Sequence, residues 1–571
     1  MSDGLDAAAT AAAEDDIAVD NGDAPMADDD DDDNVDDDDD DKAVVDAAES
    51  DNLKIEKDGD KSDENEKLEA LLFDDDDDDN EAVVKAEDFD GAKIERNGDK
   101  SDDNEKLEAL LFDDDDEDDE FPSSSAPPAP PPADDLSTSL RASDPQVMRS
   151  FYQRLFPWRQ LFLWLNHSPS PTNDFANREF AFTLQNDAYL RYQSYTTSDL
   201  LRKDVLRLVP SRFEIGPVYS TNPRDRKTLR GSSAFKPVAK ELCFDIDMTD
   251  YDDVRTCCDK ANICQKCWAF ITMAIRVVDV ALRDDFGFSH ILWVYSGRRG
   301  AHAWVCDRKA RLLDDQKRRA IAGYLDVVRG GAHAGKKVNL RRPLHPHLSR
   351  SLDILKSHFQ HDVLDAQDPW ATTEQAEKLL QLLPDRTLND SLRRKWQSTT
   401  SDRGSSSRWA DIDDVAKKMG NSGFDPRALL EAKQDVVLEY SYPRLDVEVS
   451  KKLNHLLKSP FVVHPGTGRV CVPIDTSRLA DFDPLGVPTV QNLLAEIDAW
   501  KKRKEDDDDG DDEIKEEGVD NRGAKTKTAV ADWEKTSLKP YVDYFKSFIA
   551  GLLRDEKGVR VKREREEGLD F

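Results

Sequence analysis

The 571-residue sequence lacks any apolar run of about 18 residues, the length that a membrane-spanning helix needs. Its first residues, MSDGLDAAAT, also lack the basic and apolar segments of a secretory signal. We therefore expect an intracellular, reducing compartment, where cysteines more often bind metals or lie buried than form disulfides. Only seven cysteines occur, and four of them fall between residues 257 and 267.

Basic residues are scarce in the chain as a whole but not in its central part. Against 120 Asp+Glu there are 80 Lys+Arg, which gives a net charge of -40. Residues 151–500 contain 51 basic and 44 acidic residues, a net charge of +7, so the remaining residues together carry −47. The body is long enough for one large domain or two smaller ones. Its mild positive charge is compatible with nucleic-acid contact without establishing it.

The first 146 residues consist largely of Asp runs followed by a Ser/Pro-rich stretch at 123–133. This composition buries too little apolar surface to offset chain entropy, so a disordered acidic extension is predicted. Within it, KIEKDGDKSDENEKLEALLFDDDDDD at 54–79 returns as KIERNGDKSDDNEKLEALLFDDDDED at 93–118. Each copy carries a Leu/Phe cluster at helical spacing, which suits a helix that forms on a partner. The alternative is a recent duplication without a selected role.

Apolar patterning in the body predicts interleaved helices and strands. Helices are expected at 151–163, 268–282, 310–330, 373–383, 489–502 and 541–553, with helical pieces in the polar stretch 385–430. Strands are expected at 179–184, 189–192, 242–248, 291–295, 302–306, 437–440, 445–449 and 469–473. Because the order has no βαβ regularity, the pattern favours an α+β fold.

An alternating carboxylate pair lies inside ELCFDIDMTD. A strand points alternate side chains to one face, so Asp245 and Asp247 are expected side by side while Ile246 faces the core. Burying two neighbouring carboxylates is costly, and a divalent cation offsets that cost. A solvated strand edge is the alternative, but the flanking apolar residues argue for burial.

Two later stretches supply a third carboxylate and a set of phosphate-binding groups. SGRRGAHAW offers Ser296, Arg298, Arg299 and His302 around two glycines in a hairpin, a set suited to a triphosphate. PRLDVEVSKKLNHLLKSPFVVH adds Asp446 on an expected strand, followed by Lys458 and His464. Three carboxylates, two metals and a basic clamp are the components of a two-metal nucleotidyl transfer site. A tight surface turn and a core histidine are the alternatives for the hairpin residues.

The clustered cysteines form a second candidate site. Cys264 and Cys267 have the Cys-x2-Cys spacing that lets two thiolates reach one tetrahedral Zn²⁺. Cys257 and Cys258 are adjacent, a less usual arrangement that a turn can still bring to the metal. We expect one structural zinc, with a buried thiol cluster as the alternative.

The body from about Phe151 to Asp483 resembles the archaeal/eukaryotic DNA primase small-subunit family, and closely the eukaryotic form. The resemblance rests on the motifs above and on REFAFTLQNDAYLRYQSY, CQKCW, GRVCVPID and KTSLKPYV. It implies a two-lobed α+β core with an RRM-like sheet, a zinc-binding motif and a helical insertion at 310–430. Composition and the resemblance together divide the chain into the extension 1–146, which is not part of the family pattern, a core at 147–500, a charged linker at 501–532 and a helical tail at 533–571.

The resemblance also implies roles for single residues. Asp245, Asp247 and Asp446 match the carboxylates that bind two Mg²⁺ or Mn²⁺, and Glu179 matches a further catalytic residue. The nucleotide contacts that it implies are Arg191, Ser296, Arg298, Arg299, His302, His455, Lys458 and His464. Arg212 stands where the family often has lysine. The four clustered cysteines match the zinc ligands.

The implied activity is de novo synthesis of short RNA primers on single-stranded DNA from ribonucleoside triphosphates during replication. The alternatives are a primase-polymerase that prefers deoxynucleotides and a non-catalytic nucleic-acid-binding subunit of the same fold. The implied partners are a large primase subunit with an Fe–S cluster and the DNA polymerase α complex. A replisome scaffold that binds the acidic repeats is a further hypothesis. A nuclear location is expected, and KKRK at 501–504 and VKRER at 561–565 are weak import signals or simply solvated helix ends.

Overall fold

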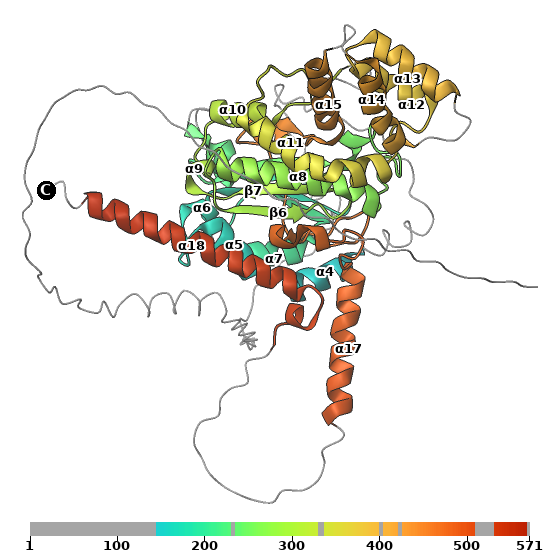
Figure 1. Cartoon of the computed structure of the whole chain (residues 1–571). Helices are drawn as coiled ribbons and strands as arrows, with labels where there is room; N and C mark the ends of the chain where they lie inside the picture. The colour runs from blue at the N-terminus through green and yellow to red at the C-terminus, as the bar shows by residue number, and fades with distance from the viewer. Residues whose placement is uncertain are drawn as a thin grey trace, which may run out of the picture. The chain divides into compact units, whose positions relative to one another are not determined.

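A computed structural model describes residues 144–229, 234–328, 336–398, 404–420, 425–508 and 530–567 (Figure 1). All of these fall within one compact unit of the chain. The acidic extension up to residue 143, both Leu/Phe clusters and residues 509–529 of the charged linker lie outside the described residues, so the predictions for them are untested. No helix in the described part of the chain is long and apolar enough to cross a membrane.

Helices make up most of the regular structure. The α-helices are α4 (Pro145–Arg154), α5 (Trp158–Asn166), α6 (Asn173–Ala176), α7 (Ser198–Leu208), α8 (Gln265–Asp284), α9 (Arg308–Arg311), α10 (Asp315–Leu325), α11 (Pro346–His358), α12 (Thr373–Leu382), α13 (Arg386–Ser398), α14 (Ser405–Met419), α15 (Pro426–Ser441), α16 (Val447–Lys451), α17 (Val490–Asp508) and α18 (Lys539–Glu567). Shorter helical turns are η1 (Pro223–Thr228), η3 (Met248–Tyr251), η4 (Phe359–Asp365), η5 (Thr476–Asp481) and η6 (Asp532–Lys535).

The strands form two antiparallel sheets. The first sheet has the order β2 (Tyr189–Gln193), β1 (Arg178–Thr183), β3 (Arg212–Tyr219), β4 (Pro237–Ala239), and β8 (Leu457–Lys458) also pairs with β3. The second sheet has the order β5 (Leu242–Asp247), β7 (Gly300–Val305), β6 (Ile291–Tyr295), β9 (Pro473–Ile474). Helices packed on antiparallel sheets confirm the α+β prediction.

Helix α8 covers the second sheet, and Figure 1 shows it running across β6 and β7. Its apolar residues recur at helical spacing and are buried, among them Trp268, Ile271, Ile275 and Leu282. The strands beneath are buried along almost their whole length, as apolar strands covered by helices should be. The core of the molecule therefore lies directly under the strand that carries the carboxylate pair.

The C-terminal helix α18 returns to the core and packs on α5 and β9. Trp164 of α5 contacts both Trp304 of β7 and Phe545 of α18, with ring centroids 5.3 and 5.7 Å apart. Such edge-to-face aromatic contacts add to the apolar area that they bury. Residues near the two ends of the described chain thus share one cluster with the second sheet.

Between β7 and β8 all described regular elements are helical. Helices α12 to α15 gather at one side of the molecule in Figure 1. The strands predicted at 437–440 and 445–449 are wrong, because 437–440 belongs to α15 and 447–451 is α16. The apolar residues near the end of α15 are buried, so their run carries no strand periodicity that could separate a helix from a buried strand. Whether residues 310–430 form a separate subdomain stays a prediction.

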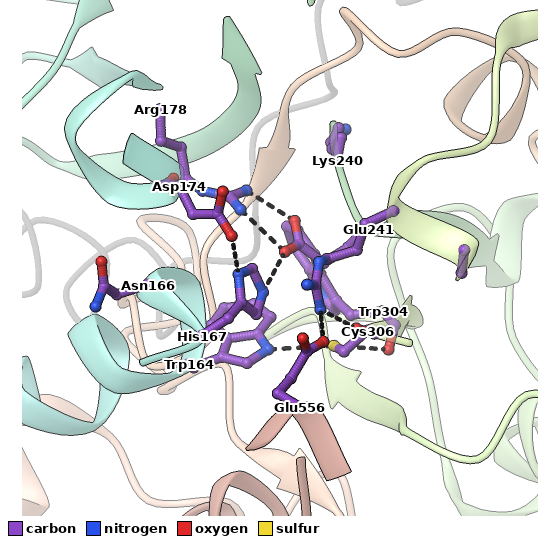
Figure 2. A network of polar contacts seen from close by, with 12 residues as sticks. Trp164, Asn166, His167, Asp174, Arg178, Lys240, Glu241, Trp304, Cys306 and Glu556 are labelled. Atoms are coloured by element: carbon purple, nitrogen blue, oxygen red, sulfur yellow. Dashed lines mark hydrogen bonds and ion pairs between the residues drawn. The ribbon is translucent and has the colours of Figure 1, made fainter. Parts of the chain in front are cut away.

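A buried ion pair joins the two sheets (Figure 2). Arg178 of β1 donates hydrogen bonds of 2.8 and 3.0 Å to Glu241, which directly precedes β5, and both side chains are fully buried. His167 adds a 3.4 Å contact to Glu241 and a 2.9 Å bond to Asp174. Burial acts to raise the pKa of Glu241, but Arg178 and His167 hold that pKa well below its usual range. The carboxylate is therefore ionised and paired.

We predict that Glu241→Gln destabilises the protein by about 3–5 kcal/mol, because it leaves the Arg178 guanidinium buried without a countercharge. Urea unfolding of both proteins measures the difference. Glu431→Gln is the matched control, since Glu431 pairs at 3.0 Å with an arginine that is 80% exposed and should contribute below about 1 kcal/mol. Equal stability of the two variants would contradict the proposed joint between the sheets.

Candidate active site

Strand β5 carries the carboxylate pair as the alternation predicts. Ile246 is fully buried, whereas the side chains of Asp245 and Asp247 remain 27% and 36% exposed. The strand pairs with β7 so that Asp245 lies opposite His302 and Asp247 lies opposite Gly300. The pairing brings two motifs that are 50 residues apart in the sequence to one edge of the second sheet.

The third carboxylate comes from a helix rather than from the predicted strand. Asp446 caps α16, and its side chain accepts a 3.1 Å hydrogen bond from the backbone N–H of Glu448. The backbone N–H of Asp446 donates to the carbonyl of Asp245 at 3.1 Å. Ser450 of α16 donates to the carbonyl of Cys243 at 2.7 Å. Two bonds to the β5 backbone thus hold α16, and with it Asp446, beside the carboxylate pair.

Two of the acidic groups have raised pKa values. Burial raises the pKa of Asp245 to about 7, and the charges of Asp247 and Asp446 add to the effect. Burial and the same two charges raise the pKa of Asp250 to about 6. Without a cation the site holds more negative charge than its surroundings stabilise, which is the electrostatic condition for metal binding.

The turn between β6 and β7 needs its two glycines. Gly297 has φ +87°, and a Cβ there would lie 2.6 Å from the Cβ of His464. A Cβ on Gly300 would lie 2.2 Å from the carbonyl oxygen of Ile246. The hydroxyl of Ser296 accepts a 3.0 Å hydrogen bond from Gly300 N–H and so closes the turn. Close approach of the backbones places this turn against both β5 and the segment of His464.

Two cationic side chains and a neutral histidine lie beside the carboxylates. The Nε of Arg299 bonds to both oxygens of Asp247, at 2.8 and 2.9 Å. Lys458 of β8 donates to the carbonyl of Ser296 at 3.0 Å. His302 Nε2 lies 3.6 Å from Asp245 Oδ1, and burial followed by the charge of Lys458 lowers the pKa of this histidine to about 3. His302 is therefore neutral at physiological pH.

His464 lies among the same cations. Burial and the charges of Lys458, Arg298, Arg212 and Arg299 hold its pKa well below the usual range, so the ring is neutral. Its Nδ1 accepts a 3.1 Å hydrogen bond from Gly466 N–H, which leaves the proton on Nε2. The ring can therefore donate one hydrogen bond to an anion surrounded by guanidinium and ammonium groups.

Glu179, Arg191 and His455 belong to a neighbouring part of the site, on and beside the first sheet. Glu179 is fully buried and accepts from Arg191 Nε at 3.1 Å, from Tyr192 N–H at 3.1 Å and from Tyr219 Oη at 3.0 Å. Arg191 and His455 line a cavity of about 580 Å³. The other lining residues are Thr183, Asp187, Tyr189, Arg212, Glu214 and Leu456. In this arrangement Glu179 contacts Arg191, and no contact between Glu179 and the three aspartates is recorded among the described residues.

Two residues in this region were missed by the sequence analysis. Asp250 follows the pair by three positions in MTDY, and only its raised pKa marks it. Arg444 lies two residues before Asp446, donates to the carbonyl of Asp250 at 2.7 Å and bonds to Asp253. Its backbone N–H also bonds to the hydroxyl of Tyr251 at 3.0 Å. These contacts hold the segment that leads to Asp446 in place. No local sequence pattern predicts them.

The four clustered cysteines converge as predicted. The sulfur atoms of Cys257, Cys258, Cys264 and Cys267 all lie within 4.8 Å of one another. Burial opposes ionisation of Cys264, but backbone N–H groups and neighbouring thiols lower its pKa to about 7. The cluster also contacts the helical region, because Thr256 N–H donates to Gln367 Oε1 at 2.9 Å. The geometry could hold one metal ion.

Comparison with known proteins supports the resemblance over most of the chain. A sequence model of the family described as DNA primase small subunit matches residues 244–476. The DNA primase small subunit of Schizosaccharomyces pombe is 56% identical over 429 residues, which are 74% of this chain and 93% of the relative. That of Saccharomyces cerevisiae is 40% identical over 447 residues, 76% of this chain and 100% of the relative. That of Drosophila melanogaster is 39% identical over 437 residues, which are 75% of this chain and 96% of the relative.

The family model covers Asp245 and Asp247 of β5, the hairpin and the segment of Asp446, whose geometry has just been described, and the identities to the relatives extend well beyond the motifs. The chain belongs to the DNA primase small subunit family, in its eukaryotic form.

Proposed function

We propose that this protein is the catalytic primase subunit that synthesises short RNA primers de novo on single-stranded DNA during replication. Membership of the family supports the enzyme class, a primer-synthesising nucleotidyltransferase. The single observation that carries the proposal is the meeting of Asp245, Asp247 and Asp446 at the end of β5, opposite a group of cations. A nucleic-acid-binding subunit without catalysis would use the cations but would not need the three carboxylates.

The carboxylate set fits hard divalent cations. Mg²⁺ and Mn²⁺ prefer carboxylate oxygens, and the raised pKa of Asp245, buried beside the charges of Asp247 and Asp446, reflects an excess of negative charge that such ions would stabilise. We propose that Asp245, Asp247 and Asp446 hold two of them. When bound, these ions would lower the pKa of a ribose 3′-hydroxyl and neutralise the charge of the triphosphate.

The basic residues would hold the triphosphate. Ser296, Arg298, Lys458 and the Nε2–H of neutral His464 surround one region and suit the β- and γ-phosphates. Arg299 must change partner in this scheme. While it bonds to Asp247 it neutralises that carboxylate, and it turns to the phosphates when Asp247 serves as a metal ligand.

The residues of the first sheet would act on the rest of the nucleotide. Glu179 holds the guanidinium of Arg191 beside the cavity that His455 also lines, so we assign Glu179 a positioning role toward Arg191. His302 lies beside Asp245 as a neutral ring and can donate or accept one hydrogen bond there. Proton removal from the attacking hydroxyl by Glu179 is the alternative role, and burial of its carboxylate argues against that role.

Soft sulfur ligands suit the cysteine cluster to zinc. Four sulfurs within 4.8 Å can close a tetrahedral site, and the low pKa of Cys264 helps it to bind as thiolate. We propose that Cys257, Cys258, Cys264 and Cys267 bind one structural Zn²⁺. A site closed by four thiolates leaves no position for substrate, so its effect on catalysis would be indirect.

Family membership also supports proposals about assembly and location. We propose that the protein works in the nucleus with a large primase subunit that carries an Fe–S cluster and with the DNA polymerase α complex. The two Leu/Phe clusters of the acidic extension would bind a multivalent replisome component, since two copies on one chain raise avidity. The helical stretch 310–430 would be the insertion expected in this family.

The first prediction for function uses an unprimed single-stranded DNA template. The wild type should make short RNA from ribonucleoside triphosphates, while Asp245→Asn and Asp446→Asn should lose at least about 10³-fold in rate, because each removes a ligand that stabilises transition-state charge. Both variants should melt at or above the wild-type temperature without metal, because carboxylate repulsion is relieved. Gel analysis of labelled products and thermal melting with and without Mn²⁺ give the two readouts.

Asp414→Asn on the exposed face of α14 is the matched control and should change neither readout. Efficient long products from deoxynucleotides alone would favour the primase-polymerase alternative. Near-normal primer synthesis by either site variant would refute the carboxylate assignment.

The second prediction concerns the clamp. Arg299→Ala should lower kcat/KM for nucleotide about 30- to 150-fold, because a charge-assisted guanidinium–phosphate bond is worth about 2–3 kcal/mol. Arg299→Lys should recover only part of the loss, since it keeps the charge but not the planar fork. Steady-state kinetics at saturating template measure this effect. Arg427→Ala, on the exposed face of α15, is the control, and unchanged kinetics for Arg299→Ala would show that the turn is only structural.

The third prediction concerns the cysteines. Freshly purified protein should carry one Zn²⁺ per chain, and Cys264→Ser should lose zinc and lower the melting temperature more than it lowers kcat at a permissive temperature. Cys471→Ala, which removes a buried core thiol, should retain zinc. Elemental analysis provides the measurement, and zinc-free wild type or full zinc retention by Cys264→Ser would contradict the assignment.

A further inference from the structure

A group of aromatic rings lies on the first sheet, outside the carboxylate and phosphate-binding groups. Phe235, which directly precedes β4, stacks on Tyr219 of β3 with ring centroids 4.1 Å apart and an interplanar angle of 7°. Tyr192 of β2 contacts both rings, at 6.3 and 6.0 Å. Tyr219 is buried, whereas Phe235 and Tyr192 are partly exposed. The group therefore forms an aromatic platform whose outer members reach solvent.

Cations surround this platform. The guanidinium of Arg226 lies 4.4 Å from the ring centroid of Tyr192, and that of Arg224 lies 4.5 Å from the ring centroid of Tyr195. Lys227 follows on η1 and Lys236 is adjacent to Phe235, and both are exposed. We call Arg224, Arg226, Lys227 and Lys236 the cationic patch. Asp225 is the one acidic residue within the described residues of this segment.

The backbone at Tyr192 is held in an uncommon conformation. Its φ is +59°, in the left-handed region that a bulky side chain rarely adopts. Its N–H donates to Glu179 Oε1 at 3.1 Å, and the hydroxyl of Tyr219 donates to Glu179 Oε2 at 3.0 Å. One buried carboxylate therefore fixes two of the three platform rings.

The same carboxylate connects the platform to the nucleotide cavity. Glu179 Oε1 also accepts from Arg191, which lines the cavity of about 580 Å³ together with Arg212 and His455. The guanidinium of Arg191 lies 4.8 Å from the ring centroid of Tyr192. A polymer that passes over the platform would thus continue directly to the cavity.

We propose that the aromatic platform and the cationic patch bind the single-stranded DNA template on its way to the nucleotide cavity. A base stacks on the face of Phe235 that points away from Tyr219, Tyr192 supports this ring from the side, and the patch neutralises backbone phosphates. The inference rests on the proposed function, because a primase must place a template base beside the incoming nucleotide. Stacking rings set among cations are the combination that binds single strands without sequence preference.

The rings favour nucleic acid over an acidic peptide as the ligand. A peptide of Asp and Glu would be attracted by the patch but would gain nothing from flat, partly exposed rings. A DNA strand uses both features, since every base has a face that stacks. Binding to an abasic DNA strand, which keeps the phosphate charge but lacks the bases, distinguishes recognition of charge alone from recognition of bases.

The experiment measures binding of the full-length protein to a 15-mer of thymidylate and to an abasic 15-mer of equal charge. Changing Arg224, Arg226 and Lys227 together to Ala should weaken both ligands and reduce the slope of log affinity against log salt by about 2, at about 0.7 per phosphate contact. Phe235→Leu keeps apolar cover over Tyr219. It should lower the affinity for the thymidylate strand about 5- to 150-fold and leave the affinity for the abasic strand unchanged.

Changing Arg394, Lys417 and Lys418 together to Ala removes three cations from α13 and α14 and is the matched control. KM for template should rise in the patch variant while KM for nucleotide at saturating template stays constant. Equal affinity and salt slope in the patch and control variants would overturn the proposal. Equal loss for thymidylate and abasic strands in Phe235→Leu would overturn the stacking contact.

The experiments distinguish failure of the template-binding proposal from failure of the proposed function. A wild type that makes no primers contradicts the function, whatever the binding data show. A wild type that primes normally, with a patch variant of unchanged template KM, contradicts this inference alone.

Discussion

Mutual repulsion among the carboxylates at the end of β5 is the constraint on which the site depends. Asp245 is held beside Asp247 by strand alternation and beside Asp446 by a backbone hydrogen bond, and burial, with the charges of these two neighbours added, raises its pKa to about 7. Such a cluster costs stability unless cations balance it. Arg299 balances part of this negative charge, because its guanidinium bonds to the carboxylate of Asp247. The remaining excess of negative charge would be balanced by divalent cations, which is why we propose a metal site here rather than a surface of acidic residues.

The surrounding structure keeps this cluster from relaxing. The Arg178–Glu241 pair joins the first sheet, beside the cavity that Arg191 lines, to the strand of the carboxylates, at the residue directly before β5. Gly300 lets β7 lie against the carbonyl of Ile246, and Gly297 lets the turn lie against His464. These close contacts hold the backbones that carry the carboxylates near one another. Lys458, one of the cations that we propose to bind phosphate, is hydrogen-bonded to the carbonyl of Ser296 in the same hairpin.

The parts of the site that local patterns encode were predictable from the sequence. Alternation placed Ile246 in the core and both aspartates on one face, the glycines marked the hairpin, and cysteine spacing indicated the thiol cluster. The third carboxylate was predicted as a member of the site but on the wrong element, because DVEVS alternates like a strand while the capping bond of Asp446 starts a short helix.

Long-range contacts were beyond local reasoning. Glu179 alternates on a strand like any half-buried glutamate, and only the fold reveals that Arg191, Tyr192 and Tyr219 share its two oxygens. Arg444 stabilises the segment of Asp446 through partners almost 200 residues away in the sequence. The left-handed backbone of Tyr192 has no sequence signal, since no glycine or asparagine marks it.

The most direct test of the account is anomalous diffraction from crystals that contain Mn²⁺ and a non-hydrolysable ribonucleoside triphosphate. The account predicts two manganese peaks, about 3.5–4 Å apart, that both contact the carboxylates of Asp245 and Asp247, with Asp446 beside one of them and Arg299 turned from Asp247 to the phosphates. Manganese bound elsewhere, with Arg299 still paired to Asp247 and the triphosphate away from Lys458 and His464, would contradict it.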